Sequence, residues 1–258
     1  MTAKTDHAAE DEHNQVQPED QELSLLDHLT ALRKALIISA AAVLIGFACV
    51  FSFAIDWLMA LLTRPITQRG ITIVFTAVSE ALVTKFKVAL VAGIIVAFPV
   101  IVWQVWKFIQ PALYAHEKRL FRAMFFAALL LFLIGIVFCV FAVYSLALDF
   151  FMVSGENLAE PMLSIDKYIG FLAGFILPFG IAFMLPVFLY ITTRLGITNA
   201  KMLAGCRKYV ILGLAVFAAI LTPPDVVSQV MLLIPMLLLY EVSILVSRLT
   251  KQRMPEEN

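Results

Sequence analysis

Residues 35–55 read ALIISAAAVLIGFACVFSFAI, an apolar run without a charged side chain. As an α-helix this run spans about 30 Å, which matches the hydrocarbon core of a bilayer. Comparable runs recur along the chain, so the sequence predicts an all-α integral membrane protein with six transmembrane helices. The predicted spans are residues 35–55, 87–106, 123–148, 168–192, 209–221 and 226–246.

The last two predicted spans are short and less regular than the others. Residues 209–224, even as one unbroken helix, cover only about 24 Å, less than the roughly 30 Å of the hydrocarbon core. We therefore expect either a bilayer that is thinned around this helix or neighbouring helices that shield it.

The composition agrees with a membrane protein and excludes other classes. Of the 258 residues, 62% are hydrophobic and only 15% are charged. The formal net charge is zero and no sustained basic stretch occurs, which argues against nucleic acid as a partner. Cys49 and Cys139 lie inside apolar runs and Cys206 in a basic loop, so we expect free thiols.

The distribution of cations predicts the orientation. With the N-terminus in the cytoplasm, 14 of the 19 lysines and arginines lie inside, and both termini are cytoplasmic. The five that lie outside are Arg64, Arg69, Lys85, Lys87 and Lys167.

Three regions follow from this topology. Residues 1–23 form an acidic tail, expected to be disordered and cytoplasmic, which is the reverse of a signal or transit peptide. Residues 24–248 form the membrane domain, and residues 249–258 a short cytoplasmic C-terminal tail. In the external segment 56–86, apolar residues at helical spacing around Ala77, Leu82, Val83 and Phe86 predict an outer interfacial helix.

No motif for catalysis, metal binding or cofactor binding is present. HEKRL begins like a zinc-protease motif at His116, but the second histidine would have to stand at Leu120. The sequence has no GxSxG elbow, no glycine-rich phosphate loop and no Cys/His array. The prediction is a protein that is not an enzyme and carries no cofactor or metal.

Polar groups at membrane depth are costly, and they are functional candidates for that reason. Asp225 follows two prolines where the sixth helix should start, and it either caps that helix or binds a partner. Gln229 lies one turn further and could bind a foreign helix within the membrane. We assign Glu241 to the cytoplasmic interface near Arg248 rather than to proton transfer.

Four stretches together resemble the TatC family, the signal-peptide receptor subunit of the twin-arginine (Sec-independent) protein translocase. They are LLDHLTALRKALI (25–37), FPVIVWQVWKFIQPALYAHEKR (98–119), FGIAFMLPVFLY (179–190) and residues 207–241, which contain LTPPDVVSQ. The resemblance covers residues 24–248 and implies a bacterial inner-membrane protein that takes part in the proton-motive-force-driven export of folded proteins.

The resemblance implies two binding sites. The first binds twin-arginine signal peptides on the cytoplasmic face; the matching residues are Leu32, Arg33, Phe108, Pro111, Leu113, Tyr114 and Glu117. The physics agrees, because a guanidinium pairs well with a carboxylate in bidentate geometry. The second site docks single-span TatA-like and TatB-like helices; its residues are Thr222, Pro223, Asp225, Ser228 and Gln229. The resemblance also implies several copies within a larger complex.

Two positions depart from the family pattern. Ala31 stands where the family usually has a glutamate, and Met184 where it commonly has a glutamate or another polar residue. Asp27 lies four residues before Ala31 and thus on the same helical face, about 6 Å away along the axis. Our hypothesis is that Asp27 replaces part of the missing carboxylate; the alternative is an acid that simply favours the first helical turn.

Two other functions compete with the receptor. A proton-coupled secondary transporter would use Glu80, Asp225 or Glu241 as a relay, and a membrane scaffold would bind partners without a signal peptide. Against the transporter stand the absence of duplicated halves and the apolar Met184 at the midplane.

Overall fold

The computed structural model describes residues 25–109, 118–155, 162–221 and 226–249, and these residues are almost entirely helical. The first half contains α1 (Leu25–Phe53), α2 (Ile55–Thr67), β1 (Thr72–Val74) and α3 (Glu80–Ile109). The helix α4 (Lys118–Phe138), the π-helix η3 (Cys139–Val143) and α5 (Tyr144–Gly155) follow one another directly. The second half contains β2 (Met162–Ser164), α6 (Ile165–Phe183), α7 (Leu185–Arg194), α8 (Ala200–Gly205), α9 (Arg207–Leu221) and α10 (Val226–Leu249).

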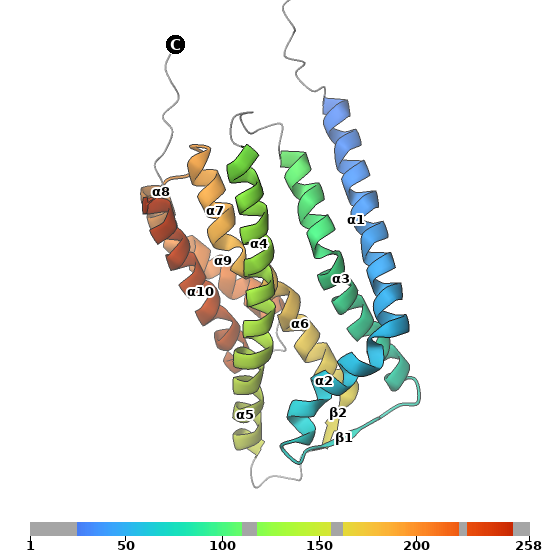
Figure 1. Cartoon of the computed structure of the whole chain (residues 1–258). Coiled ribbons are helices and arrows are strands. Elements are labelled where there is room, and N and C mark those ends of the chain that lie inside the picture. The colour runs from blue at the N-terminus through green and yellow to red at the C-terminus, as the bar shows by residue number, and fades with distance from the viewer. Residues whose placement is uncertain (1–24, 110–117, 156–161, 222–225, 250–258) are drawn as a thin grey trace, which may run out of the picture.

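The long helices stand side by side and run alternately up and down (Figure 1). The start of α1, the end of α3, the start of α4 and the end of α10 lie at one end, which we call the loop end. The helix α2, both strands and the end of α5 lie at the opposite end, which we call the α2 end.

Five of the predicted spans coincide with helices that are long and apolar enough to cross a membrane: Leu29–Phe53, Glu80–Phe108, Arg122–Phe150, Ile165–Arg194 and Val226–Leu249. The remaining predicted span, residues 209–221, lies in α9. This helix has 15 residues and is about 22 Å long, too short to cross a bilayer alone. The number of crossings therefore stays a prediction.

The outer helix lies in a different place from the one predicted. The helix between the first two spans is α2, Ile55–Thr67, whereas Leu82, Val83 and Phe86 belong to the first turns of α3. The apolar periodicity of residues 77–86 was real, but it continues without a break into the span behind it. Because neither proline nor glycine occurs in residues 80–92, these residues extend the long helix instead of forming a separate one.

Two short parallel strands close the α2 end. Thr72, Ile73 and Val74 of β1 pair with Met162, Leu163 and Ser164 of β2, in that order. The pairing joins the segment after α2 to the segment before α6, so these two connections at the α2 end are fixed to each other.

Glycines allow the helices to approach closely at two crossings. A Cβ on Gly46 of α1 would lie 2.6 Å from the backbone oxygen of Gly93 in α3. A Cβ on Gly135 of α4 would lie 2.7 Å from the backbone oxygen of Phe179 in α6. Small residues at such crossings are typical of membrane helices, where van der Waals packing replaces the hydrophobic effect between helices.

The fourth predicted span is broken into α6 and α7 at Met184. Pro186 lies in the first turn of α7 and has no backbone N–H to continue the helix ladder. The Met184 N–H instead donates to the Ile181 carbonyl, 3.0 Å away. Pro99, Pro178 and Pro235 lie inside α3, α6 and α10.

Candidate functional site

The predicted signal-peptide residues that the structure describes lie at the loop end. Leu32 and Arg33 are exposed in the third turn of α1, with 38% of the Leu32 surface accessible, and Phe108 is half-buried in the last turn of α3. The contact of Gly46 with Gly93 holds α1 against α3, and the two helices run in opposite directions (Figure 1). The structure therefore brings the start of α1 and the end of α3 to the same end of the protein.

The other residues predicted for this site are not all described. Pro111, Leu113, Tyr114 and Glu117 lie outside the described residues. Asp27 belongs to the first turn of α1, but its side chain is not described. The predicted substitution of the missing acid by Asp27 therefore stays untested.

The predicted partner-helix site lies on α9 and α10. Thr222, Pro223 and Asp225 lie outside the described residues, whereas Ser228 and Gln229 lie in the first turn of α10. Ser228 is buried. The Gln229 side chain donates from Nε2 to the Ala215 carbonyl of α9, 3.0 Å away, so this amide also holds α9 against α10.

Glu241 forms an ion pair with Arg207, a partner that the sequence did not indicate. Arg207, at the start of α9, donates from Nε to Oε1 at 2.7 Å and from Nη2 to Oε2 at 2.9 Å. The predicted neighbour, Arg248, lies two helical turns along the same helix, whereas Arg207 is brought in by the α9–α10 packing. Both side chains of the pair are about half exposed, and the bidentate geometry fixes the start of α9 to α10.

Two further hydrogen bonds strengthen the same region. The Tyr240 hydroxyl donates to the Leu203 carbonyl of α8 at 2.8 Å, and the hydroxyls of Thr193 in α7 and Ser247 in α10 lie 2.9 Å apart. These contacts join α7, α8 and α10 at the loop end.

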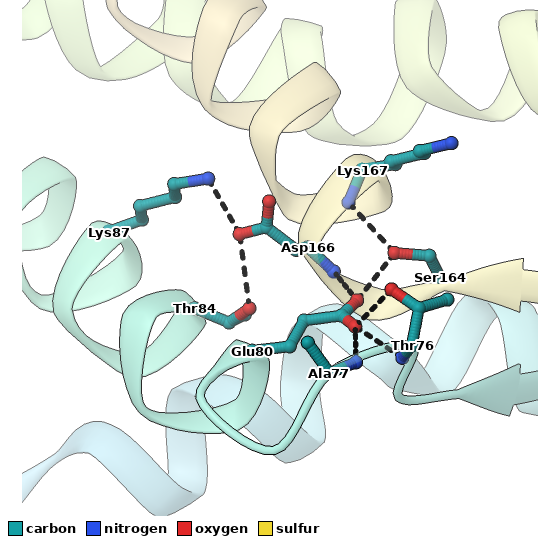
Figure 2. Close-up of polar contacts among 8 residues, drawn as sticks. All are labelled: Thr76, Ala77, Glu80, Thr84, Lys87, Ser164, Asp166 and Lys167. Atoms are coloured by element: carbon teal, nitrogen blue, oxygen red, sulfur yellow. Dashed lines mark hydrogen bonds and ion pairs between the residues drawn. The ribbon is translucent and has the colours of Figure 1, made fainter.

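The most densely bonded polar group in the described residues is Glu80, at the α2 end (Figure 2). Its Oε2 accepts hydrogen bonds from the Thr76 N–H, from the Thr76 hydroxyl at 2.7 Å and from the Ala77 N–H at 3.1 Å. Its Oε1 accepts from the Ser164 hydroxyl and from the Asp166 N–H at 3.0 Å. Glu80 is buried, and it links the start of α3 to the β2–α6 junction.

A second carboxylate lies beside Glu80. Asp166 Oδ1 accepts from Lys87 Nζ at 2.6 Å and from the Thr84 hydroxyl at 3.4 Å (Figure 2). The Ser164 hydroxyl, which donates to Glu80, also caps α6 by accepting from the Lys167 N–H. With both its oxygens occupied by donors of the chain itself, Glu80 serves to join α3 to α6.

Only part of this network could be predicted from the sequence. Glu80 stands out as a polar interruption of an apolar segment, but two of its partners, Ser164 and Asp166, lie more than 80 residues away. The signal that could have found them is the pair of Ser164 and Asp166 directly before the fourth predicted span, since a serine and an acid there are typical of a helix N-terminus.

The remaining chemistry of the described residues is modest. No group of three or more His, Cys, Asp or Glu side chains that could hold a metal ion occurs among them. Cys49, Cys139 and Cys206 are all free thiols, which confirms the prediction from the sequence.

Comparison with known proteins agrees with the resemblance found in the sequence. The family profile described as Sec-independent protein translocase protein (TatC) matches residues 27–235. The Sec-independent protein translocase protein TatC of Carboxydothermus hydrogenoformans is 41% identical over 236 residues, which cover 91% of this chain and 97% of that protein. The protein of the same name from Escherichia coli is 37% identical over 227 residues, which cover 87% of this chain and 88% of that protein.

A solved structure also matches. The crystal structure of a twin-arginine translocase receptor, TatC, superimposes with a TM-score of 0.80 at 41% sequence identity. The match covers 86% of this chain and 98% of the crystallised one, so the similarity extends over the whole bundle of helices.

Proposed function

Because this chain belongs to the TatC family, as a component of the twin-arginine translocase and a multi-pass protein of the inner membrane, we propose that it is the subunit that binds twin-arginine signal peptides. The family is one of non-enzymatic receptor subunits. The observation that carries the proposal is the family match over residues 27–235 together with the common position of the α1 start and the α3 end.

The proposed topology has six crossings and both termini in the cytoplasm, with the loop end inside. The five cations assigned to the outside support it, because all of them lie in or near α2, in the first turns of α3 or in the first turn of α6. α1 begins and α10 ends at the opposite end (Figure 1). In this topology α9 and α10 together form the last hairpin, and α9 is the short helix within it.

The proposed signal-peptide site lies at the loop end. Leu32, Arg33 and Phe108 form its described part, and Asp27, Pro111, Leu113, Tyr114 and Glu117 complete it. Its most specific contact is between Glu117 and an arginine of the signal peptide, because a carboxylate and a guanidinium form two parallel charge-assisted hydrogen bonds. The close contact of Gly46 in α1 with Gly93 in α3 supports the site by holding these two helices together.

Co-purification tests this proposal. The protein in mild detergent should retain a precursor with a twin-arginine signal peptide and should release the same precursor with two lysines in place of the arginines. Equal retention of the two precursors would contradict it.

The proposed partner surface lies on α9 and α10, where single-span TatA-like and TatB-like helices dock in a complex that contains several copies of this chain. Support comes from α9, on which Leu212, Val216 and Ile220 are exposed and stand four residues apart on one face. Gln229 lies on the neighbouring helix, and Thr222, Pro223, Asp225 and Ser228 belong to or adjoin the turn between the two. Transport by the complex is driven by the proton motive force.

A proton-coupled transporter is not favoured as an alternative. Among the described carboxylates that this function would use, Glu80 accepts hydrogen bonds on both oxygens and Glu241 forms a bidentate pair with Arg207. A scaffold without signal-peptide binding is the second alternative, and the twin-lysine comparison separates it from the receptor.

A further inference from the structure

A cavity of about 580 Å³ opens in the half of the bundle nearer the α2 end. It lies among α2, α3, the continuous α4–η3–α5 segment and α6, and none of its lining residues belongs to the two proposed binding sites. Its volume is within the range of about 300–1,000 Å³ that is typical of small-molecule sites.

The polarity of the cavity changes along its length. Ile95, Ile136 and Ile176 line the part at mid-height of α3, of the continuous α4–η3–α5 segment and of α6, where the wall is apolar. Arg64 and Gln68, from the last turn of α2 and the residue that follows it, line the part at the α2 end. The cavity is therefore apolar toward the middle of the membrane and cationic toward its surface, which is the profile that complements a phospholipid.

The cavity also opens sideways. Val137 and Phe141 line it and remain exposed, Phe141 with 73% of its surface accessible. In a multi-pass protein such apolar side chains face the acyl chains of the bilayer. A lipid could thus enter from the membrane without crossing water.

The helix that forms one wall is distorted at this place. The π-helix Cys139–Val143 interrupts the α4–α5 rod, and π-turns inside α-helices occur frequently at functional sites. Tyr144 follows it directly, lines the cavity and is only 3% exposed. Its ring contacts that of Tyr168, which also lines the cavity, with the ring centroids 5.4 Å apart.

Arg64 differs from three other cations at the α2 end, which form ion pairs. Arg69, Lys85 and Lys87 are paired with Asp149, Asp56 and Asp166 respectively. Arg64 is exposed and forms no ion pair within the described part of the chain. An unpaired guanidinium beside an apolar cavity is a favourable partner for a phosphate.

We propose that this cavity binds one phospholipid from the leaflet on the α2 side. Its phosphate lies on Arg64 and Gln68, and one acyl chain runs between Ile95, Ile136 and Ile176. A transmembrane helix does not fit, because a cylinder about 10 Å wide and 30 Å long fills about 2,400 Å³. The proposal is independent of signal-peptide binding, since none of these residues belongs to that site.

Photolabelling tests the proposal. The protein is reconstituted in vesicles of phosphatidylethanolamine and phosphatidylglycerol that contain a small fraction of phosphatidylglycerol with a diazirine on one acyl chain. After irradiation, adducts are mapped by mass spectrometry. We expect adducts on Ile95, Ile136 or Ile176 inside the cavity, and adducts on exposed Leu44 of α1 as the internal reference for bulk lipid.

Two pairs of variants make the test specific. Ala173→Phe fills the cavity and should abolish the cavity adducts, whereas Ala48→Phe on the exposed face of α1 should leave them unchanged. Arg64→Gln should lower them about fivefold, as expected for the loss of one cation near lipid phosphates. Lys167→Gln, which removes an exposed cation outside the cavity, should have no effect.

Adducts at Leu44 that match the wild type show that a variant is folded and surrounded by lipid. The proposal is overturned if the wild type shows no cavity adducts, or if Ala173→Phe keeps them. It is also overturned if Arg64→Gln and Lys167→Gln give the same cavity labelling, because the headgroup would then not be recognised.

Discussion

Gly46 of α1 lies directly against the backbone of Gly93 in α3, so that a Cβ on Gly46 would stand 2.6 Å from the Gly93 carbonyl oxygen. The contact fixes the distance between the two helices whose loop ends carry Leu32, Arg33 and Phe108. The geometry of the proposed signal-peptide site thus depends on two residues that lie deep in the membrane, far from any signal peptide.

Gly46→Ala should destabilise the protein. The added methyl group meets backbone, which cannot rotate away, and overpacking of this kind costs about 1–3 kcal/mol. A Cβ at 2.6 Å from a backbone oxygen belongs at the upper end of this range, which exceeds the gain in helix propensity of about 1 kcal/mol for replacing glycine by alanine. Unfolding in mixed micelles with increasing SDS measures the difference. Gly213→Ala in α9 is the control, because nothing lies within 4 Å of its Cβ and this change should be neutral or stabilising. Equal destabilisation by both changes would refute the close contact.

Glu80→Gln should lower the thermal stability more than Glu241→Gln does. Glu80 accepts hydrogen bonds at both carboxylate oxygens. A glutamine keeps only one acceptor oxygen, and its NH₂ group would face the donors that now bond to the other oxygen. Glu241 belongs to a half-exposed ion pair, in which water replaces a lost partner. Thermal unfolding of the purified protein in detergent compares the two variants. The same midpoint for both would mean that the Glu80 network does not hold the α2 end together.

The difference between these two acids shows what the sequence allowed and what it did not. Periodicity and the lengths of apolar runs predicted five helices that are long enough to cross the membrane, and also the short α9, because a bilayer imposes its thickness on each segment. The partners of Glu80 and Glu241 were beyond such reasoning. Both acids bind residues at least 34 positions away, and the packing of helices alone decides which distant side chains meet.

The error in the predicted position of the outer helix has a similar cause. Residues 55–67 contain Pro65 and a polar end and show no long apolar run, whereas residues 77–86 are periodic but continuous with α3. A periodic pattern identifies helical residues without saying where one helix ends and the next begins. Here the boundary is set by the β1–β2 pairing and by the hydrogen bonds of Glu80, which are both tertiary contacts.

Gln229→Leu should weaken cross-linking to a single-span TatB-like helix and leave signal-peptide binding unchanged. The side chain lies on the proposed docking surface, and it also bonds the Ala215 carbonyl, so its loss frees α9 from α10 in the same place. Disulfide cross-linking between an introduced cysteine on α9 and one on the partner helix measures the effect. Val230→Leu, an apolar change at the exposed neighbouring position, is the control. Cross-linking that survives Gln229→Leu intact would show that the partner docks elsewhere.

Glu117→Ala should lower the affinity for a twin-arginine signal peptide by about tenfold or more, as expected when a charged residue loses its hydrogen-bonded partner. Because this chain has Ala31 where the family usually has a glutamate, Glu117 is the one carboxylate that matches the family motif at this site. Ala31→Glu should therefore restore part of the binding in the Glu117→Ala background.

If Asp27 already replaces the missing acid, Asp27→Asn should lower export further while the membrane level of the protein stays normal. Full activity of the Glu117→Ala, Asp27→Asn double variant would show that other groups read the arginines.

The most direct test of the receptor function is site-specific photocross-linking from position 108. A photoreactive phenylalanine in place of Phe108 keeps an aromatic side chain at the end of α3 and leaves Glu117 intact. On irradiation in membranes that contain the complete translocase, we expect a cross-link to the signal peptide of a twin-arginine precursor, and a cross-link reduced at least tenfold for the twin-lysine precursor. The same reactive group at Leu44, on the exposed mid-membrane face of α1, should give neither product. Equal cross-linking of both precursors from position 108, or none of either, would contradict the assignment of this site.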